Sequence, residues 1–200
     1  LPKIGMDHVI LDSERRSIRF GIPGIEINLG GIGKGYTVDL IVEVLERIGV
    51  KSAFVNAGGS TFYALGTPPG EEGWQVGIRD PFDQDKHVQI VSLCDRSLST
   101  SGNYERFFEH EGRIYCHILD PRTGRPVENM LSATVLAPTA TETDALSTAF
   151  FVLGPQGTES YCCSHGSVSA VLLVAQEGLK SYQRREFNLE ENSKRIGEER

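Results

Sequence analysis

The stretch INLGGIGKGYTVD, residues 27–39, places four glycines and one lysine directly before a helical pattern. A P-loop requires Ser or Thr after its lysine and a glycine ahead of the turn, whereas Gly35 follows Lys34 and Asn28 occupies the glycine position. The dinucleotide fingerprint also fails, because Tyr36 stands where the third glycine belongs. Two explanations remain open. The glycines allow a close backbone approach or a positive φ without any ligand, or the helix N-terminus that follows holds an anion.

Outside this stretch most of the chain has the pattern of short strands. Runs of β-branched and aromatic residues are bounded by Gly, Pro, Asp or Asn, which is typical of strands. The predicted strands are SIRF (17–20), IEIN (25–28), SAFVNA (52–57), TFYALG (61–66), WQVGIRD (74–80), HVQIVSL (87–93), RIYCHIL (113–119), SATVLAP (132–138), SVSAVLLVA (167–175) and LKSYQRR (179–185). Many consecutive strands with few helices predict an α+β domain with a mixed, largely antiparallel sheet.

Two segments have helical periodicity instead. The first has an apolar stripe that ends at Gly49, and the second has one that ends at Gly154. The stripes consist of Val38, Ile41, Val42, Leu45 and Ile48, and of Ala145, Leu146, Ala149, Phe150 and Leu153. A third helix is predicted over residues 155–164. We expect one domain over residues 1–188, followed by a charged C-terminal tail, LEENSKRIGEER, over residues 189–200.

Composition limits the classes of protein that fit. The 200 residues are 39% hydrophobic and 24% charged, which is enough for one full core. A formal net charge of −7 argues against nucleic acid as the main partner, because phosphate binding requires a basic patch. No apolar run reaches the length of a membrane span. The chain opens LPKIGMDHVI, with neither a signal peptide nor an initiator methionine, so a trimmed N-terminus is expected.

The four cysteines are not arranged for metal binding. Cys94, Cys116, Cys162 and Cys163 include no C-x-x-C spacing. Cys94 and Cys116 lie in strand-like segments and are expected to be small buried hydrophobic residues.

The segment APTATETDALSTAFFVLG, residues 137–154, combines a helix start with two oxygen ligands. Thr141 followed by Glu142 and Asp144 is typical of a helix N-terminus and predicts Asp144 in the first turn. Asp144 and Thr148 are four residues apart, so both side chains lie on one helix face. A carboxylate and a hydroxyl in this arrangement suit a hard cation such as Mg²⁺. The simpler alternative is that Asp144 caps the helix and Thr148 bonds to its own backbone.

Two further segments are rich in polar residues. SLSTSGNYERF, residues 97–107, and HILDPRTGRP, residues 117–126, are each most simply interpreted as turns. His117 lies at the end of a predicted strand. A histidine at such a position is either packed or a proton carrier near neutral pH, and from the residues alone packing is favoured.

Taken together, five ordered segments resemble the ApbE family of flavin transferases, formerly called thiamine biosynthesis lipoproteins. They are NLGGIGKGYTVD, VNAGGS, STSGNYER, HILDPRTGRP and TETDALSTAFFVLGP, and the resemblance extends from about His8 to Ala175. It implies an enzyme that takes FAD and Mg²⁺, joins FMN through a phosphoester bond to a threonine of an acceptor protein, and releases AMP. Acceptors in the family include flavoprotein subunits of ion-translocating redox complexes that carry a threonine flavinylation motif.

The resemblance also implies roles for individual residues. Asp144, Thr148 and the backbone carbonyl of Gly31 would coordinate the metal, which an oxygen-only site would also accept as Mn²⁺. His117 would be the general base, and Asp120 would orient its turn or the metal region. Backbone or side-chain contacts with the nucleotide are implied for Gly30, Gly31, Gly33, Lys34, Ser99, Thr100, Ser101 and Gly102.

The chain departs from the family pattern in two ways. Asn28 and Ser60 stand where the family usually has Asp. Relatives also extend further at the N-terminus, with an export signal and often a lipid-attachment cysteine. We therefore expect the N-terminal part of the family to be missing here, and membrane attachment to require an anchor that this chain lacks. By resemblance the location is the bacterial cell envelope or periplasm, with a cytoplasmic short form as the alternative.

Three activities fit the same residues. The first is the transferase. In the second, water replaces threonine, and the protein is an FAD pyrophosphatase that yields FMN and AMP. In the third, the chain is an inactive, truncated module that binds flavin or metal.

Overall fold

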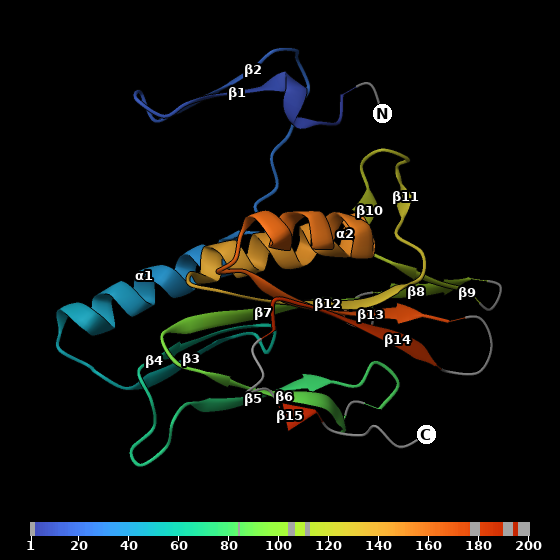
Figure 1. Ribbon diagram of the computed structural model, residues 1–200. Coiled ribbons are helices and arrows are strands. Elements are labelled where there is room, and N and C mark those ends of the chain that lie inside the picture. Colours follow the sequence, from blue (N-terminus) through green and yellow to red (C-terminus); the bar gives the residue numbers. More distant parts are fainter. Residues whose placement is uncertain are drawn as a thin grey trace.

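A six-stranded antiparallel sheet forms the centre of the molecule, with strand order β14-β13-β12-β7-β4-β3 (Figure 1). The computed structural model describes residues 3–83, 85–103, 107–110, 113–176, 181–189 and 194–195. The strands of this sheet are β3 (Ala53–Ala57), β4 (Thr61–Leu65), β7 (Arg96–Gly102), β12 (Met130–Ala137), β13 (Ser169–Ala175) and β14 (Tyr182–Phe187).

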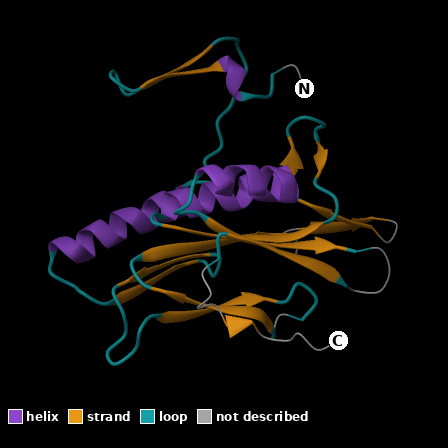
Figure 2. Ribbon diagram, viewed as in Figure 1, coloured by secondary structure: helices purple, strands orange, loops and turns teal. Residues whose placement is uncertain are grey.

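The two faces of the sheet are covered by different elements. The helices α1 (Gly33–Arg47) and α2 (Ala140–Ser164) lie on one side, and a smaller sheet lies on the other (Figures 1 and 2). The smaller sheet has the order β15-β6-β5 and consists of β5 (Trp74–Arg79), β6 (His87–Leu93) and β15 (Lys194–Arg195). The α+β prediction is confirmed.

Burial on both faces explains the apolar sequences of the central strands. Ala170 and Leu172 of β13 pack with Phe150 of α2, whereas Val171 and Leu173 pack in the core that also contains side chains of β5 and β6. Successive side chains of a strand point to opposite faces, so a strand covered on both sides is apolar at every position. The sheet therefore separates two hydrophobic cores.

The remaining elements are short. A 3-10 helix, η1 (Met6–His8), precedes the hairpin of β1 (Val9–Asp12) and β2 (Ser17–Phe20), which stands apart from the sheet on the helix side (Figure 1). Two further hairpins are formed by β8 (Phe107–His110) with β9 (Arg113–Cys116), and by β10 (Leu119–Asp120) with β11 (Arg125–Pro126). Within the described residues, no helix is both long and apolar enough to span a membrane.

One strand prediction and one turn prediction were wrong. Residues 25–28 form no strand, although IEIN alternates apolar and polar residues. Conversely, residues 97–107 were predicted as a turn, but Arg96–Gly102 form strand β7, which pairs with both β4 and β12. Its serines satisfy their hydroxyl groups against neighbouring elements, which a prediction from hydrophobic periodicity cannot detect.

The helix predictions need three corrections. Helix α2 begins at Ala140, because Thr139 is the N-cap and accepts a hydrogen bond from the Glu142 N–H, so Asp144 lies beyond the first turn. The predicted second and third helices join in α2 across a kink at Gly154, whose φ is 68°. In the predicted apolar stripe at α1, Ile48, which caps the C-terminus of the helix, is 69% exposed, and Ile41 is also exposed.

The cysteine and tail predictions are resolved in part. Cys116 is buried as expected, but Cys94 is exposed because it lies in the turn after β6. Of the predicted tail, residues 189, 194 and 195 are described, and Lys194–Arg195 pair with β6. The rest of the tail lies outside the described residues.

Candidate functional site

A polar interface joins strand β7 to helix α2. Ser97 Oγ lies 2.8 Å from Thr143 Oγ1, and Ser101 Oγ lies 3.0 Å from Ser147 Oγ and 3.2 Å from Thr148 Oγ1. These serines occupy alternate positions of β7 and therefore face the same side of the sheet. Because buried hydroxyls require partners, the paired groups fix how α2 sits along the strand.

Asp144 lies beneath this interface and is only 3% exposed. Its Oδ2 accepts a hydrogen bond of 2.9 Å from the Gly35 N–H, and Lys34 Nζ lies 3.2 Å from its Oδ1. The Thr61 hydroxyl donates to the same Oδ1 at 3.5 Å and is bonded to Ser99 Oγ at 2.9 Å. A buried carboxylate requires compensating charge and hydrogen bonds, and residues from α1 and β4 supply them here, while Ser99 of β7 is a hydrogen-bond partner of Thr61.

Helix α1 also determines where α2 begins. Asp39 Oδ1 accepts from the Ala140 N–H at 2.7 Å, and Asp39 Oδ2 accepts from the Thr141 N–H at 2.8 Å and from the Thr141 hydroxyl. This carboxylate satisfies two N–H groups that a helix N-terminus leaves unpaired, and its negative charge interacts favourably with the positive end of the dipole of α2. A Cβ added at Gly35 would lie 2.1 Å from Ala140 O, so the helices touch through backbone at that glycine.

The glycine loop brings backbone next to Thr148. Asn28 Oδ1 accepts from the Gly30 N–H at 2.7 Å, and the Gly33 N–H donates to Leu29 O at 2.8 Å as α1 begins. A Cβ at Gly31 would lie 3.6 Å from Thr148 Oγ1. None of the four loop glycines has a positive φ. Of the explanations based on backbone conformation, the structure therefore supports close approach.

These segments surround a cavity of about 770 Å³, and a second, smaller cavity of about 340 Å³ is lined by other residues. The larger cavity collects eight of the predicted site residues. They are Gly30, Gly31, Lys34, Thr100, Ser101, Gly102, His117 and Thr148. Asn28, Gly58, Ser60, Ile118, Leu119 and Val152 complete its lining. Segments that are far apart in the sequence thus meet around one space.

The other predicted residues lie outside this lining. Ser99 is buried and does not line the cavity. Asp144 is also buried outside the lining, but its ion-pair partner Lys34 and Thr148, one helical turn away, both line the cavity. Asp120 is ion-paired with Arg122 at 2.7 Å, and the hydrogen bonds from Arg122 lower the pKa of the Asp120 carboxyl. Asp120 is thus ionised at neutral pH and holds the turn that follows His117.

Several residues of the site were not predicted. Gly35, Asp39 and Thr61 contact Asp144 or the start of its helix, and none was distinguished from its neighbours by sequence pattern. Gly58 reaches the cavity through the turn between β3 and β4, where its φ is 67°. The sequence contained one signal of the buried polar strand at this site, which is the serine at every second position from residue 97 to residue 101.

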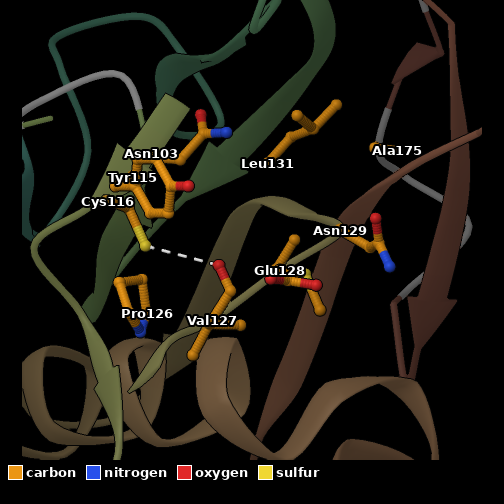
Figure 3. Close-up of a pocket in the computed structure, with 10 residues that line it drawn as sticks. Asn103, Tyr115, Cys116, Pro126, Val127, Glu128, Asn129, Leu131 and Ala175 are labelled. Carbon is orange, nitrogen blue, oxygen red and sulfur yellow. Dashed lines mark hydrogen bonds between the residues drawn. The ribbon is translucent and has the colours of Figure 1, made fainter. Parts of the chain in front are cut away.

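The smaller cavity is lined by a different set of residues (Figure 3). Among the described residues it is lined by Asn103, Tyr115, Glu128 and Leu131, and by Cys116, whose Sγ donates to Val127 O at 3.5 Å. No predicted site residue belongs to its lining.

A metal in the larger cavity would depend on few charged ligands. Within the described part of the chain, no three His, Cys, Asp or Glu side chains gather closely enough to hold an ion. The oxygen donors that the family resemblance implies are instead the Asp144 carboxylate, the Thr148 hydroxyl and the Gly31 backbone carbonyl; Thr148 and Gly31 line the cavity, and Asp144 is paired with Lys34 of the lining. This set suits a hard cation that keeps water and is completed by phosphate oxygens.

Comparison with known proteins gives a consistent result. The sequence profile of the ApbE family matches residues 1–172. The Escherichia coli K12 protein named FAD:protein FMN transferase is 34% identical over 184 residues, which is 88% of this chain and 50% of that protein. A Treponema pallidum protein of the same name is 43% identical over 148 residues, covering 69% of this chain and 41% of its own length. The chain thus spans about half the length of the curated relatives it matches.

Solved structures agree with the fold. The crystal structure of the ApbE protein from Thermotoga maritima matches 86% of this chain and 56% of its own, with a TM-score of 0.77 and 31% identity. The flavinyl transferase ApbE from Pseudomonas stutzeri matches 94% of this chain and 59% of its own, with a TM-score of 0.77 and 29% identity.

Proposed function

Because this chain belongs to the ApbE family, we propose that it is a magnesium-dependent FAD:protein FMN transferase that attaches FMN to a threonine of an acceptor protein. The observation that carries the proposal is the convergence of Gly31, His117 and Thr148 on one cavity, with the buried Asp144 joined to it by Lys34. The E. coli and T. pallidum relatives named FAD:protein FMN transferase support the transfer of FMN from FAD to a protein.

The donor groups fit Mg²⁺. Asp144 offers Oδ1 on the side of Lys34, and Thr148 presents Oγ1 beside the Gly31 backbone, where no side chain intervenes. When bound with the diphosphate, Mg²⁺ would neutralise the charge that develops as phosphoryl transfer proceeds. The protein's own contribution is to hold these three oxygen donors in place through the α1–α2 contacts.

Gly31 gives a specific test of this fit. We expect Gly31→Ala to leave folding unchanged, because the new methyl group would meet Thr148 Oγ1 at an ordinary contact distance of 3.6 Å. It would cover that hydroxyl, however, and we expect Mn²⁺ affinity to fall at least about tenfold, which corresponds to 1.4 kcal/mol. Mn²⁺ titration by electron paramagnetic resonance measures this. Gly33→Ala is the control, since its Cβ would lie 3.9 Å from Leu29 Cβ, and equal losses in both variants would contradict the proposal.

The remaining residues position the reactants. The glycine loop and the N-terminus of α1 would place backbone N–H groups near the diphosphate, and Lys34 would offer its ammonium. A ring nitrogen of His117 would take the proton of the acceptor threonine hydroxyl. The threonine oxygen then bonds to the FMN phosphorus as the phosphorus–oxygen bond to AMP breaks, and AMP leaves with the bonding electrons.

The direct experiment combines the chain with FAD, Mg²⁺ or EDTA, and an acceptor domain that carries a threonine flavinylation motif. We expect fluorescent acceptor in a denaturing gel and equimolar AMP, both only with Mg²⁺. AMP without labelled acceptor would indicate the pyrophosphatase instead. If neither labelled acceptor nor AMP is formed, this chain does not catalyse the reaction, and the binding module is favoured.

His117 is the residue to test for proton transfer. We expect His117→Ala to lower the transfer rate by about 10²- to 10⁴-fold, which is the usual contribution of a general base. FAD affinity should change little, because the proposed task of the ring is to remove a proton and not to hold the dinucleotide. The rate of acceptor labelling and FAD binding are measured in parallel. His165→Ala, at the far end of α2, is the control, and an unchanged rate in His117→Ala would exclude this role.

A further inference from the structure

Lys34 and Asp144 form an ion pair with unequal environments. The carboxylate side chain is 4% exposed, whereas the Lys34 side chain is 44% exposed and lines the large cavity. Oδ2 is held by the backbone N–H of Gly35, and the ammonium lies at the other oxygen, Oδ1. The backbone contact is fixed by helix packing. The ammonium contact is made by a flexible four-carbon side chain that can turn toward the cavity without any change in the fold.

The position of the ammonium conflicts with a bound divalent cation. Mg²⁺ binds carboxylate oxygens at about 2.0–2.1 Å. The Lys34 ammonium is already 3.2 Å from Oδ1, the carboxylate oxygen that the Gly35 N–H does not occupy. Two cations on one oxygen would repel each other, and the repulsion is strongest beside a carboxylate that is itself only 4% exposed. Only one of them can compensate Asp144 at a time.

We propose that Lys34 is a displaceable counter-ion of Asp144. A divalent cation that binds Oδ1 releases the ammonium, which turns into the cavity and pairs with the diphosphate of the dinucleotide. Metal binding therefore strengthens dinucleotide binding, and the dinucleotide strengthens metal binding by the same factor. The identity of the dinucleotide as FAD rests on the proposed function, but the exchange of cations on Asp144 does not.

The test is a Mn²⁺ titration of the full chain without nucleotide. We expect Lys34→Met to bind Mn²⁺ at least about tenfold more tightly than the wild type, because no ammonium competes for Oδ1. Lys34→Arg keeps the charge and should match the wild type. Lys51→Met removes an exposed lysine outside the cavity and should also have no effect.

Two further measurements separate competition from damage to the fold. Without metal, Lys34→Met should melt at a lower temperature than the wild type, because Asp144 loses its cation, and saturating Mn²⁺ should raise its melting temperature more than that of the wild type. Flavin fluorescence should show that FAD strengthens Mn²⁺ binding several-fold less in Lys34→Met. If this variant fails to fold, Lys34→Gln, which removes the charge but keeps an amide donor, provides the same comparison.

The outcomes distinguish this inference from the proposed function. Equal or weaker Mn²⁺ binding by Lys34→Met, with FMN transfer intact in the wild type, would overturn the counter-ion and leave the transferase. Tighter Mn²⁺ binding in a protein that transfers no FMN would support the counter-ion and overturn the transferase. A wild type that binds no Mn²⁺ would overturn the counter-ion and the metal site together.

Discussion

Asp144→Asn is expected to lower the rate of FMN transfer by about a thousandfold in a protein that remains folded. The metal supplies several kcal/mol of transition-state stabilisation in such sites, and about 4 kcal/mol corresponds to three orders of magnitude in rate. The amide oxygen can still accept the hydrogen bond that the Gly35 N–H donates to Oδ2. Lys34 loses its partner, but its side chain is partly exposed and can be solvated.

Three measurements check this expectation: the rate of acceptor labelling, Mn²⁺ affinity, and the free energy of unfolding. Glu142→Gln is the matched control, because it removes a carboxylate from the first turn of the same helix, and Glu142 is not part of the cavity lining. Transfer should be near normal in the control. A folded Asp144→Asn protein with a normal rate would show that the carboxylate holds no essential metal, and the proposed mechanism would fail.

Gly35→Ala is expected to lower the free energy of unfolding by about 3 kcal/mol, at the upper end of the cost of overpacking a tight contact. The added Cβ would lie 2.1 Å from Ala140 O and 2.8 Å from Asp144 Cβ. Backbone cannot yield as a flexible side chain does, so α1 and α2 must separate. Their separation would also break the bond from the Gly35 N–H to Asp144, and Mn²⁺ affinity should fall with stability.

Alanine is expected to change stability in opposite directions at Gly35 and at an open helix position. In an open helix position, alanine is about 1 kcal/mol more favourable than glycine. Gly33→Ala, whose Cβ would meet only Leu29 Cβ at 3.9 Å, should therefore be neutral or stabilising. Denaturant unfolding of both variants measures the difference. A gain of stability in Gly35→Ala would show that the two helices do not touch at this glycine.

Many of the strands and helices could be predicted from local hydrophobic patterns in the sequence. The apolar runs of β12 and β13 and the β-branched and aromatic residues of β4 and β5 predicted strands, and Gly154 marked the break in α2. Strand β7 was missed because its inward positions are serines. Hydrophobic periodicity identifies buried apolar side chains. It does not identify hydroxyl groups that are buried because another segment provides their hydrogen-bond partners.

The candidate site shows the same division. The proposed metal donors, Asp144, Thr148 and Gly31, were implied by resemblance, and the spacing of the first two on one helix face follows from helix geometry. Gly35 and Asp39 could not be identified in this way. Each acts on α2 across more than a hundred residues, since the separation in sequence is 109 for the Gly35–Asp144 bond and 101 for the Asp39–Ala140 bond.

The sequence by itself determined the family, the α+β class and the set of segments that carry the site, because these depend on local pattern and on ordered motifs. Only the tertiary structure decided which side chains compensate the buried carboxylate, where α2 begins, and why Gly35 must lack a side chain. The physical reason is that burial, ion pairing and backbone contact depend on neighbours in space. For this site those neighbours come from α1, β4 and β7, which meet only when the chain has folded.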